Sequence, residues 1–151
     1  MDLLETNDGI VRSKERIKKN GEVFTPEAII EKMLENCPEK DWADPSKTFL
    51  DPTCGNGQIL CCILKRRLEA GVSKRDAILT LFGIELMEDN VNLARKRLKE
   101  ILDTDEFDDI IKHNIVCSDI FMWDIGKWCP RKEKLVIKHK KTSLGGTNKV
   151  F

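Results

Sequence analysis

The middle of the chain alternates short apolar runs with apolar residues at helical spacing. The runs at residues 48–50, 81–86 and 115–117 have the length and turn-rich flanks of buried strands. After the first run, apolar residues 59–64 predict a helix that starts fully buried and extends to about Glu69. After the second, a helical face is predicted on Val91, Ala94, Leu98, Ile101 and Leu102. A weaker apolar run at 134–137 is a candidate fourth strand.

Local signals place the remaining elements. Thr25 and Pro26 read as the N-cap and first residue of a helix that carries its apolar face on Ile29, Ile30, Met33 and Leu34 and ends by Pro38. Residues 44–46 form a turn, and residues 103–109 an acidic surface segment. Ser73 with Asp76 resembles a capping box that opens a short helix.

This order of strands and helices predicts an α/β fold with a mainly parallel sheet. Right-handed crossovers give the strand order 3-2-1-4, with the four apolar runs numbered along the chain. If the run at 134–137 is the edge strand, its outer side lacks a neighbour. We therefore expect a second copy or a partner protein to cover it, or else the tail beyond Lys138 to be disordered. Ligands of such sheets bind at the carboxyl ends of the strands, which directs attention to the residues after each run.

Composition fixes the general class of protein. The chain has 151 residues, 40% hydrophobic and 34% charged, which suits one modest core and argues against wholesale disorder. No apolar run reaches the length of a membrane span, and the N-terminus lacks a signal sequence, so we expect a cytoplasmic protein without a membrane partner. The six cysteines contain no C-x-x-C pair and there are two histidines, so we expect reduced core thiols and no metal site.

Charge is unevenly distributed although the net charge is zero. Residues 27–126 hold 13 basic and 20 acidic groups, whereas residues 127–151 hold eight basic groups and one acidic group. The basic clusters at 12–19 and 127–149 could contact phosphate, and through it a nucleic acid such as DNA. The alternative for both clusters is an ordinary solvated surface.

The first strand leads into a glycine turn, DPTCGNG at residues 51–57. Two glycines between a strand and a helix let a ligand approach the backbone and the free N–H groups of the helix start. Leu60 stands where a dinucleotide fingerprint has its third glycine, and there is no G-K-[ST] sequence. The pattern therefore favours an adenosine-like ligand without a phosphate chain.

Acidic residues follow the next two strands. Glu85 ends the second strand, where a carboxylate accepts hydrogen bonds from ribose hydroxyls. Asp119 ends the third, where it could accept from an adenine amino group. Each alone could be a surface carboxylate, but together with the glycine turn they predict an adenosine site.

Three segments carry a specific resemblance. GEVFTP at 21–26, FLDPTCGNGQIL at 49–60 and GIELMEDN at 83–90 resemble the S-adenosylmethionine-binding motifs of adenine-specific DNA methyltransferases, in particular restriction-modification methylase subunits and their short phage-type relatives. The resemblance covers residues 12–124. It implies the three-layer, Rossmann-like S-adenosylmethionine-dependent methyltransferase fold, truncated at its C-terminus.

The resemblance also implies roles for individual residues. Phe24, Thr25 and Pro26 would border the methionine part of S-adenosylmethionine, and Glu85 would hold its ribose. Leu86 would pack on the adenine, whose edge Asp119 and Ile120 would hold. In the DPTCGNG turn, Asp51, Gly55 and Gly57 would line the methionine amino and carboxylate groups. Pro52 and Cys54 of the same turn would also belong to the cofactor site.

One expected motif is missing. The family places an Asn- or Asp-Pro-Pro-aromatic motif after the fourth strand to hold the flipped base. This sequence has no Pro-Pro pair and reads KHKK at 138–141. We therefore assign no catalytic residue and expect a cofactor-binding protein that is catalytically incomplete or depends on a partner.

Two alternatives are a cofactor sink or decoy acting on host restriction-modification, and a nucleic-acid-binding protein that keeps the fold for its shape. The expected organisation is an N-terminal arm at 1–20, the methyltransferase-like domain at 21–137 and a basic tail at 138–151.

Overall fold

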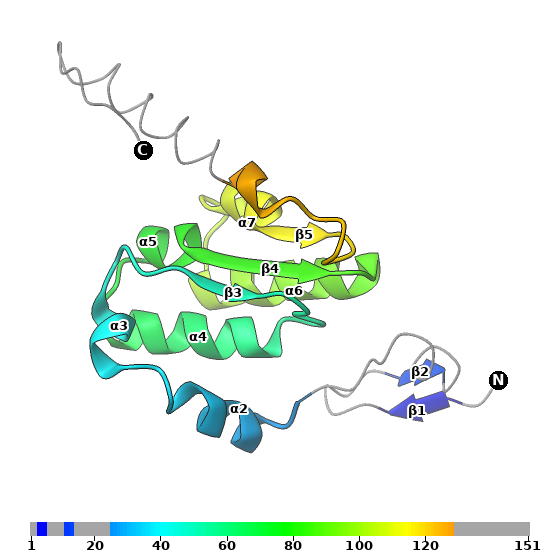
Figure 1. Cartoon of the computed structure of the whole chain (residues 1–151), viewed down its shortest axis with the longest axis horizontal. Helices are drawn as coiled ribbons and strands as arrows, with labels where there is room; N and C mark the ends of the chain where they lie inside the picture. The colour runs from blue at the N-terminus through cyan, green and yellow to red at the C-terminus, as the bar shows by residue number, and fades with distance from the viewer. Residues whose placement is uncertain (1–2, 6–10, 14–24, 129–151) are drawn as a thin grey trace, which may run out of the picture. The chain divides into compact units, whose positions relative to one another are not determined.

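The computed structural model of the chain describes residues 3–5, 11–13 and 25–128 (Figure 1). The chain separates into two compact units, Met1–Ile120 and Phe121–Phe151. In the second unit the described residues include a short 3₁₀ helix, η1 (Ile125–Trp128), and the rings of Trp123 and Trp128 lie 5.4 Å apart. Among the described residues, no helix is long and apolar enough to cross a membrane.

The first unit contains a parallel sheet of three strands, β3 (Phe49–Asp51), β4 (Leu81–Glu85) and β5 (Ile115–Cys117). Their order is β3-β4-β5, with Asp51 opposite Gly83 and Glu85 opposite Cys117. This confirms the parallel α/β sheet and the predicted order of its first three strands. The candidate fourth strand at 134–137 lies outside the described residues.

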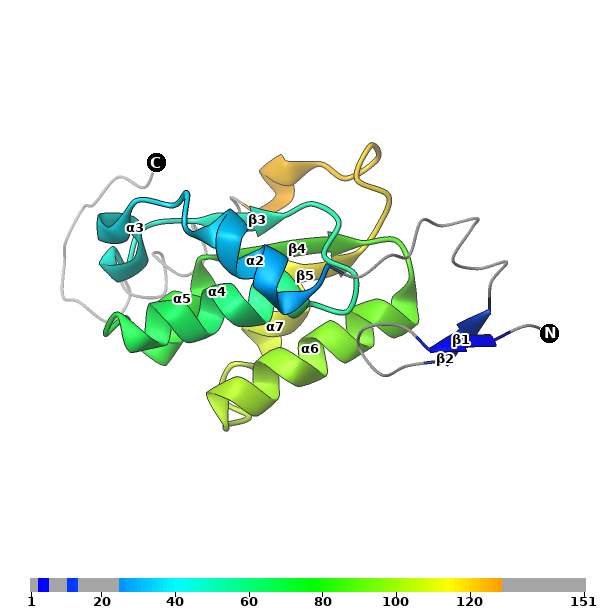
Figure 2. The same ribbon diagram turned by 90° about the horizontal axis from the view of Figure 1, so that it is seen from below.

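Two long helices, α4 (Gln58–Glu69) and α6 (Glu88–Leu102), lie side by side along one face of the sheet (Figures 1 and 2). They approach closely at Gly57, where an added Cβ would stand 2.7 Å from the Cβ of Ala94. The main core lies between these helices and the sheet. Its members include Leu60, Leu64, Leu81, Val91, Ala94, Leu98, Leu102 and Ile115.

The opposite face of the sheet carries the alternate strand residues Leu50, Phe82, Ile84 and Val116. Phe82, Ile84 and Val116 are buried, but Leu50 is 42% exposed. The expectation of a buried first strand is therefore wrong at Leu50, which lies in β3, the edge strand of the described sheet. One helical layer is described here, so the three-layer arrangement stays a prediction.

The predicted first helix is shorter than expected. α2 (Glu27–Leu34) has Pro26, not Thr25, as its N-cap, and no side chain caps it. The helix ends before Pro38, which instead begins an unpredicted helix, α3 (Glu39–Ala43). Its apolar residues also divide between two faces: Ile30 and Leu34 are buried, whereas Ile29 and Met33 are each 50% exposed.

Two short helices flank the sheet at the amino ends of β4 and β5. α5 (Lys74–Leu79) begins as predicted, because Ser73 Oγ accepts the Asp76 N–H at 3.0 Å. α7 (Asp108–Asn114) was not predicted, and the buried ring of Phe107 corrects the expectation of a purely acidic surface segment at 103–109. The start of α4 is also only partly buried, since Ile59, Cys61 and Cys62 remain half-buried.

A buried arginine on α4 holds the residues that lead into the edge strand β3. The side chain of Arg67 on α4 is fully buried and donates to Asp44 O at 2.7 Å and to Thr80 Oγ1. Its guanidinium also lies over the Phe49 ring, 5.1 Å from the centroid. Arg67 thus ties α4 to the residues that precede β3 and β4.

The N-terminal arm expected at 1–20 contains two strands that the sequence pattern did not indicate. β1 (Leu3–Glu5) and β2 (Val11–Ser13) pair antiparallel, with Leu3 opposite Ser13.

Candidate functional site at the carboxyl edge of the sheet

The glycine turn after β3 has the backbone conformation that its glycines allow. Gly55 and Gly57 have positive φ angles of 53° and 84°, which L side chains rarely adopt. The Cys54 N–H donates to Ile84 O at 2.9 Å, and the Gly57 N–H donates to Cys54 O at 2.8 Å. These bonds hold the turn against the end of β4 and aim the first N–H groups of α4 at the carboxyl edge.

Glu85 connects this turn to the second strand. One oxygen, Oε2, accepts the Gly55 N–H at 3.0 Å, and the other, Oε1, accepts the Met87 N–H at 2.9 Å. The expected ligand carboxylate therefore also shapes the loop that the ligand would touch. Sequence reasoning missed this contact, because it joins residues thirty positions apart and depends on strand register.

Asp51 is the most unusual carboxylate of the site. It is 9% exposed, and its Oδ1 accepts the Thr53 N–H at 3.1 Å. Its Oδ2 is buried without a hydrogen-bond partner among the described residues. Burial raises the pKa of Asp51, the charge of Glu85 raises it further, and the Thr53 N–H lowers it. The site thus holds, beside a second carboxylate, a buried acceptor to which no described residue donates.

The other predicted site residues are placed as follows. Leu86 follows Glu85 directly and is 55% exposed. Asp119 is exposed and Ile120 half-buried, just after β5. In the glycine turn Cys54 is buried and Pro52 exposed. At the start of α2, Thr25 is half-buried and Pro26 exposed, while Phe24 lies outside the described residues.

The sheet therefore brings together Asp51, Cys54, Gly55 and Glu85 through backbone hydrogen bonds, the Glu85–Gly55 bond and the charge of Glu85 acting on Asp51. Thr25 and Pro26 lie at the start of α2, and Asp119 follows β5. Their place beside a cofactor stays a prediction.

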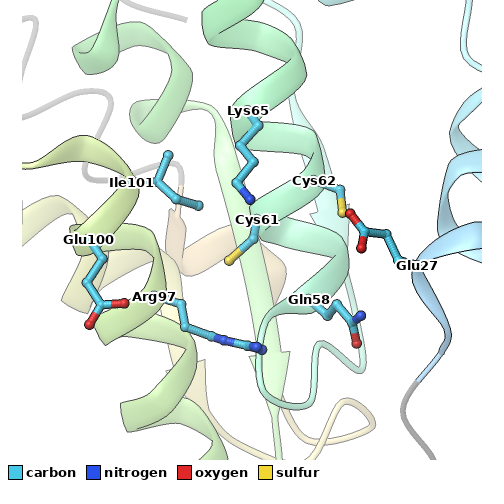
Figure 3. Close-up of a pocket in the computed structure, with 8 residues that line it drawn as sticks. All are labelled: Glu27, Gln58, Cys61, Cys62, Lys65, Arg97, Glu100 and Ile101. Atoms are coloured by element: carbon cyan, nitrogen blue, oxygen red, sulfur yellow. The ribbon is translucent and has the colours of Figure 1, made fainter. Parts of the chain in front are cut away.

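A separate cavity of about 380 Å³ lies between α4 and α6, with Glu27 of α2 at its rim (Figure 3). Its charges are mixed, with Lys65 and Arg97 opposed by Glu27 and Glu100. Figure 3 shows Cys61 pointing into this space from α4, and burial raises the pKa of its thiol to about 11. Such a thiol is largely protonated at neutral pH and is therefore a poor nucleophile.

The five cysteines that the structure describes are free thiols, and no cluster of metal-binding side chains occurs among the described residues. Of these cysteines, Cys54 is a core residue as expected. Cys37, Cys61 and Cys62 are half-buried, and Cys117 is exposed, so the expectation of core thiols is wrong for Cys117.

A parallel α/β sheet with a glycine turn after one strand and carboxylates at its carboxyl edge defines a class of ligand-binding proteins, of which nucleoside-cofactor enzymes are one group. A family model described as N-6 DNA methylase matches residues 11–126. The chain therefore belongs to the N-6 DNA methylase family, as the motifs predicted. No curated protein and no solved structure matches it.

Proposed function

We propose that this chain binds S-adenosylmethionine at the carboxyl edge of its sheet, as the cofactor-binding part of an adenine-N6 DNA methyltransferase. The observation that carries the proposal is the buried Oδ2 of Asp51, which has no partner in the part of the chain that the structure describes. Leaving a buried acceptor unpaired is costly, about 1–3 kcal/mol. S-adenosylmethionine carries an ammonium group, a sulfonium charge and ribose hydroxyls, so it offers both donors and positive charge to a site with two carboxylates.

The residues of the site suit the parts of that cofactor. Gly55 lets the backbone of the turn face its methionine end, and Gly57 lets α4 begin against Ala94 of α6. Pro52 and Cys54 complete the turn. Phe24, Thr25 and Pro26 are proposed to border the methionine end. A carboxylate has about four acceptor sites. Glu85 uses two of them for Gly55 and Met87, so it keeps acceptors for both ribose hydroxyls.

The adenine would lie at the ends of β4 and β5. Leu86 offers an exposed apolar side chain for its face. Asp119 and Ile120 would hold its edge, completing the adenosine site.

When bound, the cofactor supplies an electrophilic methyl group, and this chain's residues bind and orient it. The 151 residues contain no Pro-Pro pair to hold a flipped base. We therefore assign base holding to other residues, in a second copy or a partner subunit that pairs with the outer edge of the strand expected at 134–137. The basic clusters at 12–19 and 127–149 are proposed to hold DNA phosphates.

Calorimetric titration of the chain with S-adenosylmethionine tests this proposal. Glu85→Ala should weaken binding by about 1.5–3 kcal/mol, the range for hydrogen bonds to a charged group. Glu106→Ala is the matched control, because Glu106 is an exposed carboxylate in the loop between α6 and α7. Equal affinity in the two variants would refute the ribose assignment, and no binding by the parent chain would refute the proposed function.

The missing Pro-Pro-aromatic motif also favours a second candidate, a non-enzymatic cofactor sink or decoy. The two functions differ in one respect. A sink binds S-adenosylmethionine and transfers no methyl group even when a partner subunit is supplied.

A further inference from the structure

The exposed thiol of Cys117 stands on the same face of the sheet as the glutamate of the proposed cofactor site. Cys117 ends β5 and is the direct partner of Glu85 in the parallel register. Side chains of partner residues project from the same face of a sheet. The Glu85 carboxylate binds Gly55 on that face, so the Cys117 side chain and the glycine turn flank the same glutamate.

Two further observations fix the position of the sulfur. Cys117 Sγ donates to Leu86 O at 3.4 Å, so it lies against the residue expected to face the adenine. Burial raises the pKa of the thiol, the nearby carboxylates of Glu88 and Glu85 raise it further, and Arg95 lowers it. The sulfur therefore lies close to Glu85 and Leu86, the two consecutive site residues at the end of β4.

A second feature, separate from Cys117 itself, favours a ligand at this edge. Asp51 Oδ2, in a residue 9% exposed, is a buried acceptor without a partner among the described residues, and Asp51 lies close enough to Glu85 to be affected by its charge. Asp51, Glu85 and Cys117 thus end three adjacent strands. A ligand that fills the edge from Asp51 past Glu85 reaches Cys117.

We propose that the Cys117 thiol is a modification site in the wall of the cofactor pocket: bound S-adenosylmethionine covers the sulfur, and an adduct on the sulfur excludes the cofactor. The inference rests on the proposed function. Cys117 is the exposed cysteine among the described residues, whereas Cys54 is buried and the others are half-buried. Access therefore favours Cys117 over the other described thiols.

Iodoacetamide is a suitable probe. The thiolate attacks the methylene carbon, a sulfur–carbon bond forms, the carbon–iodine bond breaks, iodide leaves, and the buffer takes the thiol proton. Because the pKa of Cys117 is raised, labelling is slow at neutral pH and is measured in mildly alkaline buffer.

The experiment follows the labelling of each cysteine in the full chain by peptide mass spectrometry, with and without saturating S-adenosylmethionine. Cofactor should slow the labelling of Cys117 at least tenfold and leave the rate at Cys37 unchanged. The labelled chain should then show an affinity for S-adenosylmethionine at least tenfold weaker by calorimetry.

Two variants locate the effect. Iodoacetamide should leave the affinity of Cys117→Ser at its value before treatment, whereas Cys37→Ser should lose affinity as the parent does. The inference is overturned if the parent binds cofactor but Cys117 is not protected, or if the labelled parent binds as tightly as before. If the unlabelled parent does not bind cofactor, the proposed function fails first and this inference with it.

Discussion

Asp51 is nearly buried, and one of its carboxylate oxygens has no partner among the described residues. A charged Asp51 therefore lowers the free energy of unfolding. Its pKa is raised by burial and by Glu85 above the ordinary value of 3.8, so the folded state binds its proton more tightly than the unfolded state does. The contribution of Asp51 to stability is therefore favourable at low pH and is lost as pH rises from 3.8 through the raised pKa. The residue is retained at a thermodynamic disadvantage, which is common at binding sites.

Asp51→Asn tests this conflict between stability and binding. The uncharged amide keeps an acceptor for the Thr53 N–H and removes the buried charge, so we expect the unfolding free energy at about pH 7 to rise. The gain should shrink at about pH 4, where the parent side chain is protonated to a larger extent. Thermal unfolding at the two pH values measures it.

The same variant should bind S-adenosylmethionine at least tenfold more weakly by calorimetry, because the charge opposite the ammonium group is lost. Unchanged affinity would remove Asp51 from the site.

Sequence reasoning found the chemistry of single residues better than their contacts. Asp51 and Glu85 were predicted because motif residues stand where strands end. The Glu85–Gly55 bond and the Cys117–Leu86 contact were not, because both depend on register between strands that are distant in sequence. The exposure of Leu50 was missed because residue hydrophobicity does not tell an edge strand from a central one.

At the scale of elements, the contact between α4 and α6 at Gly57 sets the position of the glycine turn. Gly57 combines a positive φ of 84° with a Cβ position 2.7 Å from Ala94 Cβ and 2.9 Å from its Cα. A side chain at this position has to move a helix backbone. The loop that would bind the cofactor therefore also contains the residue at which α4 packs closely against α6.

Gly57→Ala should destabilise the chain by about 2–5 kcal/mol, since a left-handed backbone costs about 1–2 kcal/mol and overpacking about 1–3 kcal/mol. Gly71→Ala is the matched control: Gly71 has a φ of 89°, but nothing lies within 4 Å of its Cβ position. The control should cost only about 1–2 kcal/mol. Urea unfolding of both variants measures the difference. Equal losses of unfolding free energy would show that Ala94 moves aside without a measurable cost.

Elements with long apolar periods were predicted within a few residues, as α4 and α6 show. The short helices were harder. α3 was missed because Pro38 was interpreted as a stop, although proline also stands at helix starts. α7 was missed because its acidic first turn hides the apolar pair Ile110 and Ile111.

At the scale of the whole molecule, family membership and sheet order agree with the sequence, but the base-holding motif of the family is missing from the 151 residues. Transfer to an amino nitrogen requires a flipped base held in line with the methyl group. Stacking contributes about 1–3 kcal/mol per base, and positioning up to about 7–11 kcal/mol. Cofactor binding alone supplies neither the stacking on the base nor the positioning of its amino group.

The isolated chain should therefore transfer no measurable methyl group to unmethylated DNA, even when it binds S-adenosylmethionine. Incorporation of tritiated methyl groups, with and without a candidate partner subunit, measures this. Incorporation by the chain alone would show that a segment other than an Asn- or Asp-Pro-Pro-aromatic motif holds the base.

The strand order has a consequence for biosynthesis. Each described strand of the parallel sheet pairs with the strand made just before it, since β4 pairs with β3 and β5 with β4. Nascent chains emerge from the ribosome N-terminus first, at about 5–20 residues per second. The hydrogen-bonding edge of β3 that faces β4 is therefore occupied within seconds of emergence, and folding can follow translation without waiting for the C-terminal residues.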